Sequence, residues 1–163
     1  MISKKIETAL NRQIVQELSS AYLYLSMSAY FKYENLSGFA HWTQLQYQEE
    51  NDHSMRFFDY INDQNGRVIL EKISTPKATW HSIVAVFENI LTLEQHTTQS
   101  INRLVALAKS EKDYATENML QWFVAEQVEE EATIVELLYK VKFIKTSASG
   151  LLFLDKELSK SKQ

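Results

Sequence analysis

The stretch GRVILEKISTPKATWH, from Gly66 to His81, decides how the rest of the chain can fold. It holds the only proline and shows no helical period, which indicates an extended connection between two helices. A stretch of about 16 residues, extended at up to about 3.3 Å per residue, can run the length of a helix about 40 Å long. The helices on either side of it are therefore expected to lie parallel.

Four long segments with a 3.6-residue hydrophobic period flank this connection, two on each side. We expect helices over about residues 4–34, 39–65, 82–110 and 114–145. Asn65 with Gly66 favours a left-handed C-terminal cap for the second helix, and Ser82 is a suitable N-cap for the third. Only a few residues separate the helices within each pair, so each pair is expected to form an antiparallel hairpin.

Composition supports an all-α protein. The chain of 163 residues contains three glycines and one proline, and long stretches rich in Leu, Ala, Glu, Gln and Lys carry no helix breaker. This length suits one domain with a sizeable core, so residues 1–163 are expected to form a single domain. The four-helix part would cover about residues 4–145.

Charge and cysteine content narrow the classes of function. The net charge of −4 and the pI of about 5.6 offer no basic stripe, so we expect no nucleic-acid partner and favour cations. No apolar run approaches the roughly 20 residues that span a bilayer, and the start MISKKIETALNRQ lacks the apolar core of a secretory signal. The absence of cysteine fits a reducing compartment, and we expect a cytoplasmic protein without membrane contact.

Polar side chains interrupt the apolar row on the inward face of all four segments. The residues concerned are Glu17, Glu50, His53, Glu94, Gln127 and Glu130. One glutamate in an apolar row can reflect a shifted helix phase or a helix end that reaches water. Four glutamates at matched depth on separate helices instead predict that every helix projects an acid inward, about halfway along its length.

Such a layer of acids needs a compensating positive charge, because a buried, unpaired carboxylate costs several kcal/mol and neighbouring carboxylates repel one another. None of the four rows contains Lys or Arg, and His53 alone cannot balance four glutamates. A bound metal can. Glu50 and His53, three residues apart, lie on one helical face and can grip one ion. Oxygen ligands with a single imidazole suit iron or manganese, with zinc as a competitor.

These motifs together resemble the ferritins, specifically the bacterial non-haem type. The resemblance rests on QEENDH (48–53), LEQH (93–96) and AEQVEEE (125–131), on four long helices and on the long connection after the second. It covers nearly the whole chain. It implies a ferritin-like four-helix bundle with one long crossover between helices 2 and 3, and a short fifth helix in LLFLDKEL at about residues 150–159.

The resemblance further implies a ferroxidase centre with two irons. One iron would be held by Glu17, Glu50 and His53, and the other by Glu50, Glu94 and Glu130, so that Glu50 bridges. Two metals about 3.5 to 4 Å apart can share the electrons that reduce one oxidant.

Further residues gain roles only through the same resemblance. Gln127 would be a polar neighbour and weak ligand with a catalytic role, and Tyr24 an electron donor, although Tyr24 also reads as a core tyrosine with a bonded hydroxyl. Glu49, Glu126 and Glu129 would form a third iron site, and their spacing equally allows a solvent-facing position. In the same run, Glu131 is expected to be an ordinary surface residue.

By this resemblance the protein would oxidise Fe(II) with dioxygen or peroxide and store ferric oxyhydroxide in a hollow 24-subunit homo-oligomer. A second Glu-x-x-His is replaced by Gln127-x-x-Glu130, which argues against bacterioferritin and rubrerythrin, and we expect no haem. Two alternatives remain at this point. One is a di-iron oxidase or peroxidase that stores no iron, and the other is a structural bundle whose buried acids are protonated.

Overall fold

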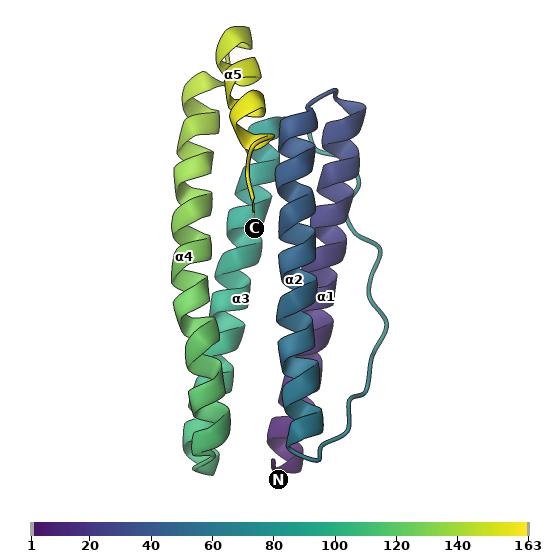
Figure 1. The fold of residues 1–163 in the computed structure, drawn as a ribbon, viewed down its shortest axis with the longest axis vertical. Helices are drawn as coiled ribbons and strands as arrows, with labels where there is room; N and C mark the ends of the chain where they lie inside the picture. Colours follow the sequence, from purple (N-terminus) through teal and green to yellow (C-terminus); the bar gives the residue numbers. More distant parts are fainter. Residues whose placement is uncertain (1, 163) are drawn as a thin grey trace.

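The structure is a computed structural model that describes residues 2–162. Five helices follow one another: α1 (Lys4–Tyr33), α2 (Ser37–Asp63), α3 (Ile83–Glu111), α4 (Tyr114–Ile144) and α5 (Ala148–Leu158). Helices α1 and α2 form one antiparallel hairpin, α3 and α4 form the other, and the two hairpins lie alongside each other (Figure 1). The described residues contain no β-strand, so the predicted all-α bundle is confirmed.

The connection between α2 and α3 runs along the outside of the bundle from one end to the other (Figure 1). Its start is held by Asn11 of α1, whose amide donates to Arg67 O at 2.9 Å and whose Oδ1 accepts from Ile69 N at 2.6 Å. Near its far end, Ser26 Oγ donates to Lys77 O at 2.7 Å. Because this connection spans the bundle, α2 and α3 are parallel, as its length predicts.

The helix ends follow local rules with two shifts from expectation. Ser82 caps α3 through a hydrogen bond from Ala85 N, and Asn65, at φ 55°, is the left-handed residue that ends α2. Helix α2 begins at Ser37 rather than at residue 39. Helix α5 begins at Ala148 rather than at about residue 150, because Ser147 accepts from the backbone N–H three residues on and caps it.

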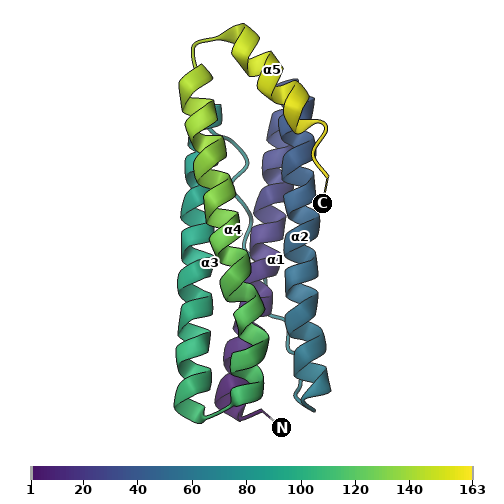
Figure 2. The ribbon, with the colours of Figure 1, turned by 60° about the vertical axis from the view of Figure 1, so that its left-hand side comes forward.

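Helix α5 crosses the end of the bundle from α4 towards the start of α2 (Figure 2). Asp155 Oδ1 accepts hydrogen bonds from Gly38 N at 2.8 Å and from Phe39 N at 3.0 Å. A Cβ atom on Gly38 would lie 1.6 Å from Asp155 O, so only glycine allows this approach. The first turn of α2 is thus capped by a distant carboxylate.

Two buried apolar clusters fill the bundle. The aromatic cluster, at the α5 end, includes Tyr24, Met27, Phe31, Phe39, Trp42, Val86, Phe87, Ile90 and Ile134. The aliphatic cluster, at the opposite end, comprises Ile6, Leu10, Ile14, Phe57, Ile61, Ile101, Leu104, Ala108, Leu120 and Phe123. Between the two clusters, each of the four long helices carries a buried, inward-facing acid. Within residues 2–162, none of the helices combines the length and hydrophobicity needed to cross a membrane.

Candidate metal centre

Four buried glutamates, one from each long helix, lie between the two apolar clusters. The exposed fractions are 0% for Glu17, 3% for Glu50, 0% for Glu94 and 8% for Glu130. Burial raises the pKa of each, and the neighbouring carboxylates add to the rise by repulsion. The predicted layer of inward-facing acids is therefore present, and we name these four residues the carboxylate layer.

Glu17 and Glu50 face each other from α1 and α2. Burial raises the pKa of Glu17 to about 7 and that of Glu50 well above its usual value. The close approach of the two carboxyl groups lowers the pKa of Glu17 and raises that of Glu50. Among the described residues, no donor reaches Oε2 of either side chain. One buried oxygen on each side chain therefore has no donor and is available to a proton or a cation.

Glu94 is held by two neighbours. Tyr24 Oη donates to Glu94 Oε1 at 2.6 Å, and Gln127 Nε2 lies 3.3 Å from both Glu94 Oε2 and Glu94 O. Burial, followed by the charge of Glu94, raises the pKa of Tyr24 well above its usual value, so the phenol stays protonated and acts as a donor. Both residues that were expected to serve as catalytic neighbours thus contact the same carboxylate.

Glu130 is the fourth member of the carboxylate layer. Burial raises its pKa to about 9, with a further contribution from the charge of Glu94 and smaller ones from Glu49 and its neighbours on α4. At neutral pH this side chain holds a proton when no metal is bound. A divalent ion would replace that proton, because a cation stabilises the ionised form.

His53 lies one turn after Glu50, with its Nδ1 3.6 Å from Glu50 Oε2. Burial lowers the pKa of the imidazole to about 4, and the nearby charge of Arg56 lowers it further. The ring is therefore neutral at physiological pH, which is the form that binds a metal. Trp122 packs edge-on against the imidazole, and the Arg56 guanidinium lies 3.8 Å from the centre of the indole ring. The packing of His53, Trp122 and Arg56 is not predicted by the sequence patterns.

The outer acids divide into two groups. Glu49, His53 and Glu126 each bring one ligand atom to within 4.8 Å of the others, a spacing that could hold a metal ion. Burial raises the pKa of Glu49, with Glu126 adding to the rise, and burial also raises that of Glu126, followed by Glu129. Glu129 is exposed and is not part of this group. His53 therefore lies beside both the carboxylate layer and the outer acids.

Glu131 is not the ordinary surface residue that the charge run suggests. Thr98 Oγ1 donates to Glu131 Oε1 at 2.5 Å and lies 3.3 Å from Gln127 Nε2. This contact connects the surface carboxylate to Gln127 and, through it, to Glu94. The charge of Glu131 also contributes to the raised pKa of Glu94. A helix-phase argument places Glu131 outside the core row but cannot show that a hydroxyl on α3 reaches it.

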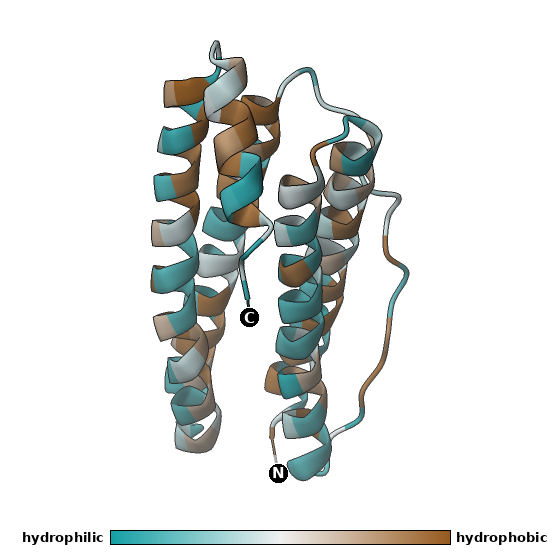
Figure 3. Cartoon of the chain, turned by 45° about the horizontal axis from the view of Figure 1, so that its top comes forward, coloured by the Kyte–Doolittle hydropathy of each residue, from teal (hydrophilic) through white to brown (hydrophobic). Residues whose placement is uncertain are grey.

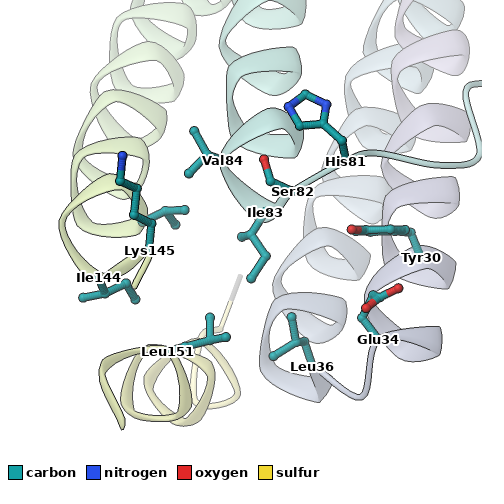
Figure 4. A pocket seen from close by; sticks show the side chains of 11 residues that line it. Tyr30, Glu34, Leu36, His81, Ser82, Ile83, Val84, Ile144, Lys145 and Leu151 are labelled. Atoms are coloured by element: carbon teal, nitrogen blue, oxygen red, sulfur yellow. The ribbon is translucent and has the colours of Figure 1, made fainter. Parts of the chain in front are cut away.

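A separate cavity of about 400 Å³ opens at the α5 end of the bundle (Figure 4). Ile83 and Val84 of α3, Leu36 before α2 and Leu151 of α5 point into it, and Lys145 lies at its edge. Its lining includes none of the site residues predicted from the sequence. The carboxylate layer therefore remains the candidate site.

The donor set fits iron. It offers carboxylate oxygens from four helices together with one neutral imidazole. Two of these oxygens have no hydrogen-bond donor within the described residues. Carboxylate-rich sites with an imidazole in a four-helix bundle are a recurring way to bind a pair of iron ions.

Comparison with known proteins agrees with this geometry. A family model described as a ferritin-like domain matches residues 7–144. The bacterial non-heme ferritin of Bacteroides fragilis (strain 638R) is 42% identical over 158 residues, covering 97% of this chain and 98% of that protein. The corresponding protein of Staphylococcus epidermidis RP62A is 39% identical over 98% of this chain and 96% of its own length.

Solved structures give the same result. An open pore ferritin from the archaeon Archaeoglobus fulgidus superimposes with a TM-score of 0.98 and 48% identity, covering 99% of this chain and all of that one (100%). An engineered closed form of the same ferritin has the same TM-score of 0.98 and covers 99% of each chain. With its four-helix bundle, crossover and layer of buried acids, the chain belongs to the ferritin family.

Proposed function

We propose that this protein stores iron: it oxidises Fe(II) at a di-iron ferroxidase centre in the carboxylate layer and deposits ferric oxyhydroxide inside a hollow shell of its own copies. One observation carries the proposal. Four buried acids converge from four helices, and two of their oxygens find no donor among the described residues. A ferritin-family chain in which burial raises the pKa of these acids is prepared to exchange protons for cations.

The proposed ligands follow the burial and contacts of each side chain. One iron binds Glu17, Glu50 and His53, and the second binds Glu50, Glu94 and Glu130, so that Glu50 bridges the two. The donor-free oxygens of Glu17 and Glu50 support the shared role, and the neutral imidazole supports a ligand at His53.

Neighbouring residues prepare this site. Gln127 and Tyr24 hold Glu94 by hydrogen bonds and keep one orientation of its carboxylate. Tyr24 is also the proposed electron donor, because its buried phenol contacts a ligand directly. Glu49 and Glu126 attract Fe(II) beside His53 and form the proposed third site, with Glu129 at its exposed edge.

Binding of Fe(II) requires protons to leave the carboxylate layer. Each Fe(II) gives one electron to dioxygen or peroxide. The protein supplies the carboxylate and imidazole ligands that hold the iron. Because burial raises the pKa values of the four glutamates, binding of Fe(II) releases protons from them, and the ionised carboxylates then stabilise the higher charge of Fe(III).

The surface supports assembly into the 24-subunit shell. Tyr139 and Phe143 of α4 and Phe153 of α5 are 70%, 80% and 67% exposed and line one apolar groove. Figure 3 shows hydrophobic segments on α5, on the adjacent end of α4 and along the connection, where Ile69 and Leu70 are exposed. Exposed aromatic side chains in such a patch mark an interface with another protein surface.

The test follows iron and particle size together. Fe(II) is added to the protein anaerobically, air or peroxide is admitted, and absorbance and gel filtration are recorded. We expect fast oxidation, followed by iron that co-elutes with a large assembly. Oxidation by protein that accumulates no iron would instead indicate a di-iron oxidase, and protein that binds no iron would indicate a structural bundle.

A further inference from the structure

Gln13 is a buried amide that contacts the carboxylate layer although no sequence pattern drew attention to it. Its side chain is 2% exposed, and its Nε2 donates to Glu17 Oε1 at 2.8 Å. Glu17 Oε1 is thereby engaged, while Glu17 Oε2 has no donor within the part of the chain that the structure describes. The two oxygens of one ligand are therefore unequal.

Ser100 of α3 holds the carbonyl end of that amide. Its hydroxyl donates to Gln13 Oε1 at 2.6 Å, which leaves the NH₂ group of Gln13 directed at Glu17. A flipped amide would turn its carbonyl oxygen towards the carboxylate, and two acceptors would face each other. The hydrogen bonds thus select one amide orientation, and that orientation suits an ionised Glu17.

We propose that Gln13, oriented by Ser100, is a positioning residue that holds Glu17 Oε1 so that Glu17 Oε2 is presented to the iron shared with His53. This inference rests on the proposed di-iron function and extends it to a residue outside the ligand set. Residues behind a metal ligand fix its orientation, and their removal typically weakens metal binding by about 10- to 100-fold.

The chain offers a matched control one turn away. Gln16 also bridges α1 to α3, with its Nε2 3.4 Å from Thr97 Oγ1. Among the described hydrogen bonds, this glutamine contacts none of the proposed ligands. Replacing Gln16 therefore removes the same chemical group between the same two helices and leaves Glu17 in place.

The experiment is an anaerobic calorimetric titration of Fe(II) into the full-length apoprotein, with oxidation rates measured separately. The variants are Gln13→Leu, Ser100→Ala, the conservative Ser100→Thr, and the control Gln16→Leu. We expect Gln13→Leu to weaken one of the two iron sites by about 10-fold or more and to leave the other within about 2-fold. Ser100→Ala should weaken the same site less, and Ser100→Thr and Gln16→Leu should match the wild type.

The outcomes separate this inference from the proposed function. Wild-type protein that binds no Fe(II) would overturn both. Wild type with two sites and a Gln13→Leu variant with two unchanged sites would overturn only the positioning role. Equal weakening of both sites, or equal effects of Gln13→Leu and Gln16→Leu, would show a general packing role and would also overturn it. Thermal unfolding of each variant verifies that the bundle remains folded.

Discussion

The aliphatic cluster and the carboxylate layer occupy neighbouring levels of the same four helices, yet they obey opposite rules. In the cluster, Phe57 stacks on Phe123 with ring centres 4.1 Å apart, and burial stabilises the fold. About two turns away along the same helices, buried glutamates raise one another's pKa and leave oxygens without donors. The cluster is built for stability, whereas the layer gives up stability to bind cations. Substitutions at the two levels should therefore separate folding from function.

The largest expected effect is on folding. Phe57→Ala removes a fully buried ring from the aliphatic cluster and should lower the free energy of unfolding by about 3–5 kcal/mol. Chemical denaturation of the metal-free protein measures this loss. At a temperature where the variant is folded, it should still bind Fe(II), because the ring does not belong to the carboxylate layer. A loss of binding without a loss of stability would contradict the division between the two levels.

The second-largest expected effect is on the rate of Fe(II) oxidation. Glu94→Ala should abolish fast Fe(II) oxidation, a fall of at least about 100-fold, while the bundle stays folded. Removing the buried carboxylate removes repulsion within the layer but leaves the Tyr24 hydroxyl and the Gln127 amide without their acceptor, so the metal-free protein should lose about 1–3 kcal/mol of stability. Stopped-flow absorbance and thermal unfolding report the two quantities. Oxidation at the normal rate would show that the ligand set is wrong.

A change of pH is expected to have a smaller effect, on the stability of the metal-free protein. The folded, metal-free protein holds protons that the unfolded chain releases above a pKa of about 4.5, because the folded pKa values of Glu17 and Glu130 are about 7 and about 9. Stability should therefore fall, by on the order of 1–3 kcal/mol, as pH rises from 6.5 to 9.5. The lowered pKa of His53, about 4, has its effect only below a pH of about 6.5.

Denaturation of the metal-free protein at several pH values measures this slope. Glu130→Gln is the control, because an amide of the same shape does not titrate and should flatten the upper part of the curve. Stability that stayed constant across this range would mean that the acids are already ionised in the folded protein.

The smallest effect concerns the phenol. Tyr24→Phe removes the O–H group that donates to Glu94 Oε1 and should lower stability by about 1 kcal/mol. Iron binding should remain at two ions per subunit, and oxidation should slow by less than in Glu94→Ala. Rapid-mixing absorbance measures both variants side by side. Equal loss of activity in the two would make Tyr24 essential rather than supporting.

The sequence was sufficient for the architecture and for the depth of the acids. Helical periodicity is local, so the inward positions of Glu17 and Glu94 follow from spacing alone, and the length of the crossover dictates the parallel pair. Contacts between helices were not accessible in this way. Gln13 meets Ser100 at a separation of 87 residues, and Arg56 covers Trp122 on another helix. Such pairs depend on rotamers and helix rotation, which no one-dimensional pattern specifies.

The cap on α2 has a consequence for synthesis on the ribosome. Gly38 N–H is satisfied by Asp155, a residue translated 117 positions later. Backbone donors at a helix start need a partner, so the first turn of α2 stays unfinished while the intervening chain is made. Gly38 N–H and Phe39 N–H gain their carboxylate partner only after α5 has emerged and crossed the end of the bundle. Nascent chains that stop short of α5 should therefore leave this end open, and its closure marks a completed subunit.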